Sequence, residues 1–317
     1  MEPMKKRIVV VGSINLDLVA RVERMPCLGE TISGQDLQTF CGGKGANQAV
    51  AAARLGVPVT LIAKLGDDHF GGHLRANLAE AGVDSTYVES VAGPSGTALI
   101  TATPNGENSI IVIPGANGKL HCDDLERCKD ELRNAAIILV QLESPLRIVE
   151  HLASLAKSFD VPLMLDPAPA QPLEERVLCA VTWFTPNESE TRTFLGDARL
   201  QVDSISAPKV AERILRMGVR NVILKLGAKG VYMAGKDVTP LYVPGFQVDA
   251  VDTTAAGDTF NGAFASGLAI RKMTPQNAAE FACAAAAISV TRHGAQTSMP
   301  KLAEVEEFLR QRSRDIR

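Results

Sequence analysis

Short apolar runs recur along the chain, separated by segments with the 3.6-residue spacing of amphipathic helices. Runs of this kind are typical of parallel strands that are buried on both faces. They fall at residues 8–11, 59–63, 137–142, 163–165, 181–184 and 222–226, and the helical patterns at 46–55, 72–81, 146–158, 207–217, 259–270, 275–292 and 301–312. The alternation predicts an α/β fold with a doubly wound, mainly parallel sheet flanked by helices on both faces.

Residues 16–40 and 97–113 break this rhythm, because they alternate apolar and polar residues and carry turn signals such as Pro104-Asn105-Gly106. They predict a small, mainly antiparallel sheet built from insertions in a single domain of residues 1–317. Such a sheet beside an α/β core would serve as a lid that keeps water from the site. A purely structural sheet or a contact between two copies of the chain is the alternative, and these roles are compatible.

The composition indicates a soluble protein and argues against some partners. The chain is 46% hydrophobic and 22% charged, and its formal net charge of −3 gives no reason to expect nucleic acid or an anionic membrane as a partner. Its six cysteines form no C-x-x-C pair, which indicates reduced thiols in the cytosol. The N-terminal apolar run is too short for a signal peptide, and no stretch is long enough to span a bilayer, so we expect a cytoplasmic protein.

Residues 252–262 carry the clearest chemical signal. Three small residues, Ala255, Ala256 and Gly257, precede Asp258, and an apolar segment with a helical pattern follows. The first N–H groups of such a helix, and the positive end of its dipole, would stabilise an anion. A carboxylate beside an anion site makes sense as a general base that takes a proton from the attacking nucleophile. The segment therefore predicts phosphoryl transfer to a hydroxyl group.

A glycine-rich turn at residues 42–47 follows one predicted element and precedes a helix. Its paired glycines would let a ligand approach the backbone, and Lys44 and Asn47 would supply donors. The spacing is not that of a P-loop. A G-x-G-x-x-G motif is also missing from the sequence, which argues against a dinucleotide-binding dehydrogenase.

Polar side chains follow several predicted strands. Asn15 and Asp17 come just after the first strand and face the same side, so they could bind vicinal hydroxyls or simply cap the strand. Because the carboxyl ends of parallel strands meet at one edge, the later polar residues suggest a shared crevice, although each could instead be a helix cap. These residues are Glu143, Asp166, Asn187 and Glu190.

Together these segments resemble the ribokinase-like family of carbohydrate kinases over residues 10–300. The Ala-Gly-Asp element is shared across the wider superfamily, whereas Asn15-x-Asp17 with the 42–47 turn is more particular. The resemblance implies a β-lid that also forms a homodimer contact, and ATP-dependent phosphorylation of D-ribose at its 5-hydroxyl. The resemblance is based on residues 12–17, 42–49, 141–143, 186–190, 251–261 and 290–296.

The resemblance also implies roles for individual residues. Asp258 would be the general base, and the backbone of Ala255, Ala256 and Gly257 the anion hole. The sugar would be held by Asn15, Asp17, Gly42, Gly43, Lys44, Asn47, Glu143 and Asp258. ATP would contact Asn187, Gly257, Cys283 and the turn formed by Lys225, Leu226, Gly227, Ala228, Lys229 and Gly230, for which a plain hairpin is the alternative. Glu190 would organise Mg²⁺ or another divalent cation. An activating K⁺ would be held, largely through backbone carbonyls, by Asp252, Thr254, Ser289, Arg292, Gly294 and Ser298.

Three positions depart from the family pattern. Ala255 replaces a common glycine, which should cost little provided that the position needs no positive φ. Lys225 stands where a small hydroxyl residue is common, and it adds attraction for phosphate. Cys283 stands where a more polar residue is common, which leaves the selectivity for adenine open.

Two other functions stay open. The same fold could phosphorylate a nucleoside, fructose or a deoxy-sugar acid, although Asp17 and Glu143 favour a free pentose. A catalytically silent sugar or nucleotide sensor belongs to a different class, but a sensor would have no need of a base at Asp258.

Overall fold

The computed structural model describes residues 6–104 and 107–315, with side chains through residue 312. Asn105 and Gly106 of the predicted turn at 104–106 therefore lie outside the described residues. None of the described helices is long and apolar enough to cross a membrane. The strands of the main sheet are β1 (Ile8–Val11), β4 (Val59–Gly66), β5 (Val88–Val91), β8 (Ile137–Gln141), β9 (Leu163–Asp166), β10 (Trp183–Phe184), β11 (Asn221–Lys225), β12 (Gly230–Gly235) and β13 (Leu241–Pro244).

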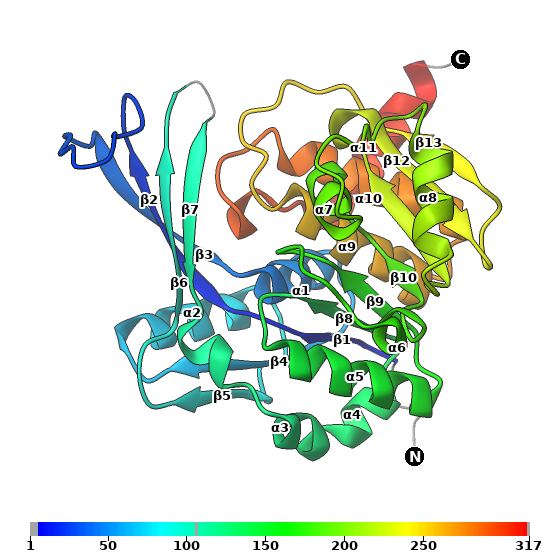
Figure 1. Ribbon diagram of the computed structural model, residues 1–317, viewed down its shortest axis with the longest axis horizontal. Helices are drawn as coiled ribbons and strands as arrows, with labels where there is room; N and C mark the ends of the chain where they lie inside the picture. Colours follow the sequence, from blue (N-terminus) through cyan, green and yellow to red (C-terminus); the bar gives the residue numbers. More distant parts are fainter. Residues whose placement is uncertain (1–5, 105–106, 316–317) are drawn as a thin grey trace.

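The main sheet has nine strands in the order β13-β12-β11-β10-β9-β8-β1-β4-β5 (Figure 1). All pairings from β5 to β11 are parallel, and β12 runs antiparallel to both of its neighbours. Alternate residues of each strand enter the hydrophobic layers on opposite faces, as with Ile8 and Val9 of β1. The predicted doubly wound α/β fold is confirmed.

Helices cover both faces of this sheet (Figure 1). One hydrophobic layer includes residues of α1 (Lys44–Arg54), α2 (His69–Glu80), α9 (Ala256–Ala265), α10 (Pro275–Ser289) and α11 (Leu302–Asp315). The other includes residues of α3 (Cys122–Arg127), α4 (Lys129–Arg133), α5 (Leu146–Phe159), α6 (Glu175–Leu178), α7 (Glu188–Phe194) and α8 (Ala207–Leu215).

Some element boundaries differ from the predicted ones. The predicted strand at 181–184 is reduced to the two residues of β10. The predicted helix at 259–270 is α9, which starts at Ala256 and is followed by a π-helical turn at Ser266–Ile270. Strands β5 and β13 were not predicted, because β5 is short and partly exposed and β13 ends in proline. Strand β12 follows the turn at 225–230, for which a hairpin was the alternative.

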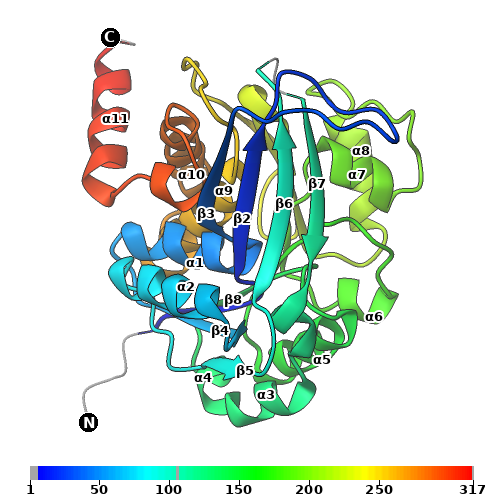
Figure 2. The same cartoon turned by 90° about the vertical axis from the view of Figure 1, so that its left-hand side faces the viewer.

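The second sheet has the order β3-β2-β6-β7 and stands out from the α/β core (Figure 2). Its strands are β2 (Asn15–Arg21), β3 (Asp36–Gly42), β6 (Gly96–Ala102) and β7 (Asn108–Ile113). The β2–β3 and β6–β7 pairs are antiparallel as predicted, but the central β2–β6 pair is parallel. Because Asn15 follows β1 closely, this sheet begins at the edge where the main strands end.

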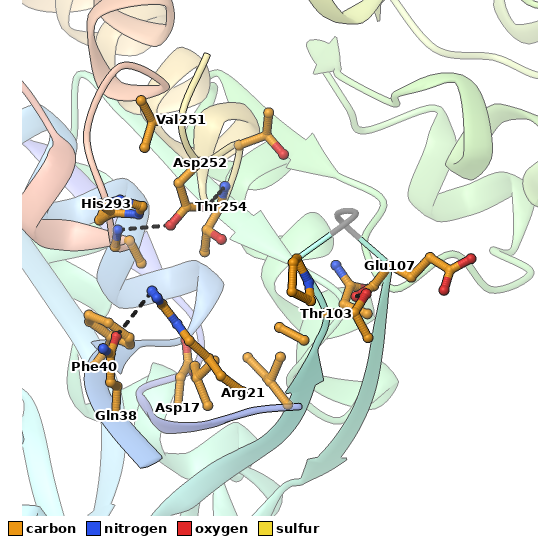
Figure 3. A pocket seen from close by; sticks show the side chains of 18 of the residues that line it. Asp17, Arg21, Gln38, Phe40, Thr103, Glu107, Val251, Asp252, Thr254 and His293 are labelled. Atoms are coloured by element: carbon orange, nitrogen blue, oxygen red, sulfur yellow. Dashed lines mark hydrogen bonds between the residues drawn. The ribbon is translucent and has the colours of Figure 1, made fainter. Parts of the chain in front are cut away.

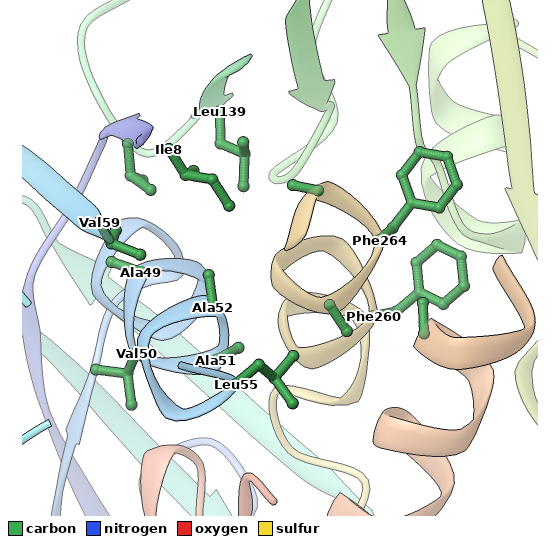
Figure 4. Close-up of a cluster of buried hydrophobic side chains, with 14 of the residues drawn as sticks. Ile8, Ala49, Val50, Ala51, Ala52, Leu55, Val59, Leu139, Phe260 and Phe264 are labelled. Carbon is green, nitrogen blue, oxygen red and sulfur yellow. The ribbon is translucent and has the colours of Figure 1, made fainter. Parts of the chain in front are cut away.

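Helices α1 and α9 pack closely because small residues face each other across their contact (Figure 4). A Cβ added to Gly262 would lie 2.7 Å from both Ala51 Cβ and the carbonyl oxygen of Gln48. Phe260 and Phe264 extend from the other side of α9 in the same cluster. The close approach places the polar first turns of the two helices next to each other, beside the carboxyl edge of the sheet.

Candidate active site

The glycine-rich turn at 42–45 lies against the start of β2. A Cβ on Gly42 would be 2.2 Å from Asp17 Oδ2, and one on Gly43, whose φ is +89°, would be 2.6 Å from the Asn15 nitrogen. These glycines therefore make room for the protein's own β2 segment. The turn is also tied to β8, because Glu143 Oε2 accepts a hydrogen bond from the Lys44 N–H at 3.0 Å.

A polar cavity of about 550 Å³ lies between the second sheet and two loops that precede α9 and follow α10 (Figure 3). The sheet contributes Asp17, Arg21 and Phe40, and the loops contribute Asp252 and His293. Burial, reinforced by the carboxylates of Glu143 and Asp258, raises the pKa of Asp17 to about 7. We call this space the polar cavity.

A second cavity, of about 230 Å³, is lined mainly by small and apolar residues, and we call it the apolar cavity. Ala250 and Thr253 line both cavities, so the two meet at the loop before α9. Six residues predicted to contact a nucleotide line it: Lys225, Gly227, Ala228, Gly230, Gly257 and Cys283. Five others that the sequence did not single out are Phe246, Phe260, Ala286, Ala287 and Val290. In the sequence, these five apolar residues cannot be distinguished from residues of the hydrophobic core.

The remaining predicted nucleotide contacts have structural roles nearby. The turn between β11 and β12 is the hairpin considered as the alternative, and within it Leu226 is buried and Lys229 is exposed. Asn187 caps α7: its side chain accepts from the Glu190 N–H at 2.8 Å, and the Glu190 carboxylate accepts in return from the Asn187 backbone and side chain, both at 2.8 Å.

The first turn of α9 begins with Ala255 in the left-handed region, at φ 58°. The alanine was expected to cost little provided that position 255 needs no positive φ. Because the position does have a positive φ, where residues with a Cβ are strained, Ala255 destabilises this turn. The Ala256 N–H donates to the Thr253 carbonyl at 3.2 Å. Among the described residues the N–H groups of Ala255, Gly257 and Asp258 have no acceptor. These three donors are open to an anion, whereas the predicted Ala256 N–H is engaged.

The Asp258 carboxylate is buried and is held by two side-chain amides from α1. Asn47 Nδ2 donates to Oδ2 at 3.0 Å, and Gln48 Nε2 donates to Oδ1 at 3.1 Å. Asn47 Oδ1 accepts from Gln296 Nε2 at 3.1 Å, so the Asn47 side chain, predicted to hold a sugar, is engaged within the protein. Gln48 was not predicted as a site residue, and its position next to Asn47 was the one indication in the sequence that it belongs to the site.

Two buried lysines are set among the carboxylates of the site. Burial disfavours the charge on Lys44, but Asp258, Asp166 and Glu143 outweigh it and raise its pKa. Lys225 behaves alike: burial opposes its charge, yet Asp166, whose Oδ1 lies 3.0 Å from its Nζ, and Glu190 raise its pKa. Both lysines are therefore cations at neutral pH and are available to bind an anionic ligand.

Glu190 is the residue that was predicted to organise a divalent cation. Burial raises its pKa, and Lys225 lowers it in opposition. Asp166 acts on the same group electrostatically, so two carboxylates share this region. Hard oxygen ligands of this kind, together with phosphate oxygens and water, suit Mg²⁺.

The residues predicted to hold a monovalent cation gather where the loop before α9 meets the end of α10. The Val290 carbonyl accepts from the Asp252 N–H at 3.1 Å, and Asp252 Oδ2 accepts from the Gly294 N–H at 2.9 Å. Although burial opposes it, hydrogen bonds from Thr254 and Gly294 lower the pKa of Asp252. Ser289 and Ser298 donate to carbonyls within their own turns, and the Arg292 side chain pairs with Glu304 of α11.

Comparison with known proteins agrees with this architecture. The pattern that defines pfkB family carbohydrate kinases matches residues 5–302. The chain is 42% identical to ribokinase of Haemophilus influenzae, over 96% of this chain and 99% of that protein, and 38% identical to deoxyribokinase of Salmonella typhi, over 95% and 98%. The structure of Arabidopsis thaliana ribokinase complexed with ribose and ATP superposes with a TM-score of 0.86 at 36% identity, covering 96% of this chain and 99% of that one. The chain belongs to the pfkB family of carbohydrate kinases.

Proposed function

We propose that this protein transfers the terminal phosphoryl group of ATP to the 5-hydroxyl of D-ribose. The observation that carries the proposal is the position of Asp258. It lies in the first turn of α9, whose neighbouring residues line the apolar cavity, and it is close enough to Asp17 of the polar cavity to raise that pKa. A base between an acceptor site and an anion site is what phosphoryl transfer to a hydroxyl requires. The likeness to ribokinases supports the choice of substrates.

The polar cavity would bind the sugar. Of the predicted sugar residues, Asp17 lines this cavity. Asn15, Lys44 and Glu143 do not line it, but they come from segments that meet behind Asp17 at the carboxyl edge of β1 and β8, where Gly42 and Gly43 let β2 approach closely. Buried charged groups of this kind orient hydroxyls strongly, because each hydrogen bond to a charged partner contributes about 1.5–3 kcal/mol. Asn47 would act on the sugar through Asp258, since its amide is engaged there.

The transfer step uses groups of the first turn of α9. Asp258 accepts the proton of the 5-hydroxyl as that oxygen attacks the terminal phosphorus of ATP, the bond to the bridging oxygen breaks, and ADP leaves. The N–H groups at Gly257 and Asp258 stabilise the charge on the phosphoryl oxygens. Lys225 Nζ adds positive charge there, since a Cβ on Gly257 would lie 3.3 Å from it.

Two cations would assist. A bound divalent cation would neutralise phosphate charge, and Glu190 is the carboxylate that would organise it, directly or through water, because both oxygens of Asp166 are engaged by Gln48 and Lys225. The loop around Asp252 and Thr254, with the segment that contains Ser289, Arg292, Gly294 and Ser298, would hold K⁺. There it would support the first turn of α9.

A coupled assay of ADP release, run with a panel of acceptors with and without K⁺, tests the proposal. We expect D-ribose to give the highest kcat/KM and ³¹P NMR to show ribose 5-phosphate as the product. A better rate with another acceptor would overturn the choice of sugar. The absence of ADP release above background with every acceptor would overturn the enzyme assignment and favour a sensor.

One observation favours a second acceptor class. The polar cavity extends from Asp17 to Arg21 and Asn108, and its 550 Å³ falls in the range of about 300–1,000 Å³ that is common for small-molecule sites. This is more room than a pentose needs, so a nucleoside belongs in the panel. The likeness to a deoxyribokinase makes 2-deoxyribose an equally necessary member.

We further propose that the second sheet closes over the sugar as a lid and joins two copies of the chain. Every residue of β7 is exposed, including the side chains of Ile110 and Ile111 at 53% and 61%. Light scattering tests the dimer, which Ile111→Glu should weaken. All six cysteines lie among the described residues as free thiols, which supports a reducing compartment such as the cytoplasm.

A further inference from the structure

We propose that Gln48 is a positioning residue that holds Asp258 and the Asp166–Lys225 pair in one arrangement, an inference that rests on the proposed function. The Gln48 side chain hydrogen-bonds to Asp258. Its other contacts lead away from the polar cavity and toward the apolar one.

Gln48 uses its whole side-chain amide. Nε2 donates to Asp258 Oδ1 at 3.1 Å and to Asp166 Oδ2 at 3.0 Å, while Oε1 accepts from Gln141 Nε2 at 2.7 Å. The residue is 1% exposed. A primary amide has two N–H donors, so each carboxylate receives one of them. Gln141 fixes which end of the amide points at the carboxylates.

The chain of contacts continues to the phosphate side. The second oxygen of Asp166, Oδ1, accepts from Lys225 Nζ at 3.0 Å. That ammonium group lines the apolar cavity and lies beside Gly257 in the first turn of α9. One unbroken row of buried hydrogen bonds thus connects the proposed base to the proposed phosphate-binding lysine.

A neutral amide suits this position better than an apolar or charged side chain. Two buried carboxylates close to each other need donors between them, and the two N–H groups of one amide supply a hydrogen bond to each. An apolar residue would leave an oxygen of each carboxylate unsatisfied. A carboxylate would add a third negative charge. The amide therefore fixes the direction of the Asp258 carboxylate, and it holds Asp166 Oδ2 so that Oδ1 points at Lys225.

The close packing of α1 on α9 makes the arrangement rigid. The carbonyl oxygen of Gln48 would be 2.7 Å from a Cβ on Gly262, one turn after Asp258. No larger residue fits at that contact, so the two helices cannot separate or slide without losing it. The distance from the Gln48 backbone to the base is thereby held constant.

The test compares Gln48→Met, which keeps the size of the side chain but removes both donors, with wild type. We expect kcat to fall about 10- to 100-fold while KM for ribose and for ATP changes less than about threefold. Gln48→Glu keeps the acceptor for Gln141 and should lower kcat further. If Gln48→Met does not fold, Gln48→Glu alone tests the proposal. A kcat within twofold of wild type in either folded variant would overturn the proposal.

A double-mutant cycle with Lys225→Met tests the connection between the two sides. Because the residues share Asp166, the double variant should be no more than about threefold slower than the slower single variant. Independent effects that multiply would overturn the connection. Asn221→Leu is the matched control: this fully buried amide binds Thr182 and Asp237 at the opposite end of β11, and its loss should lower Tm but leave kcat unchanged.

The acceptor panel keeps the two proposals distinguishable. If wild type prefers an acceptor other than ribose, the choice of sugar is wrong and the Gln48 comparison is made with that acceptor. If wild type is active and the Gln48 variants equal it, the positioning role alone is wrong. A wild type without transferase activity overturns both.

Discussion

The polar and apolar cavities meet at the loop of residues 250–253, yet they are built from different kinds of groups. Asp17, Arg21 and Asp252 face the polar cavity, whereas Phe246 and Cys283 are typical of the apolar one. A small sugar offers mainly hydroxyls, so its recognition depends on directed hydrogen bonds from buried charges. A nucleotide offers a flat base and phosphates, which shape, backbone N–H groups and a lysine can hold. The contrast predicts that single substitutions will cost more in the polar cavity.

The largest effect is expected where the cavities join. Asp258→Asn keeps the shape of the side chain and one of its two acceptors for the α1 amides, but it cannot accept a proton, so kcat should fall by about 10²–10⁴-fold. Binding of ribose and of ATP, measured by calorimetry, should persist. A variant with the turnover of wild type would show that the hydroxyl does not need this base.

The next effect is on stability and belongs to the polar cavity. Asp17 has a pKa raised from 3.8 to about 7, so between these values the folded protein binds more protons than the unfolded chain. The ligand-free protein should therefore lose free energy of unfolding as pH rises from about 4 to 7, by an amount on the order of 2–4 kcal/mol. Denaturant titrations at several pH values measure this. In Asp17→Asn the loss should shrink by this amount, and an identical slope in both proteins would contradict the assignment.

Removal of the Asp17 side chain sharpens the contrast in binding. We expect Asp17→Ala to raise KM for the sugar about 10- to 100-fold, because a hydrogen bond to a charged group is lost. KM for ATP should stay within about twofold, since Asp17 does not line the apolar cavity. Equal increases for both substrates would show that the cavities do not act separately.

The matching change in the apolar cavity should be milder. Cys283→Ala removes one sulfur atom from an apolar wall, which is expected to raise KM for ATP by about fivefold or less. KM for the sugar serves as the internal control. An increase above about 50-fold would mean that the thiol makes a specific contact with the base.

The smallest effect is expected at Ala255. Glycine relieves the strain of the left-handed backbone but adds freedom to the unfolded chain, so Ala255→Gly should raise the stability by about 1 kcal/mol at most. A thermal melt measures the gain. The kcat should not change, because the N–H groups stay in place. A fall in kcat would show that the Ala255 methyl group positions the first turn.

Much of this fold follows from local patterns in the sequence. The buried parallel strands are continuous apolar runs, so β1 and β8 were predicted to within one residue. Strand β10 was predicted two residues too long, because Val181 is buried like a strand residue although the strand begins at Trp183. Among the site residues, Asp258 could be predicted because three small residues precede it and a helical pattern follows it. Phe246 and Val290 have no such mark, because an apolar residue looks the same in a core and in a cavity wall.

The sequence by itself determined the order of the elements, the helix that follows the small residues and Asp258, and the glycines that a close approach requires. These depend on residues that are neighbours along the chain. Only the tertiary structure decided that the glycines make room for Asp17 and Asn15, that Ala255 is left-handed, and that Gln48 lies between two carboxylates. Gln48 is 118 residues from Asp166 and 210 from Asp258. Such contacts depend on how closely two helices pack, which no periodic pattern records.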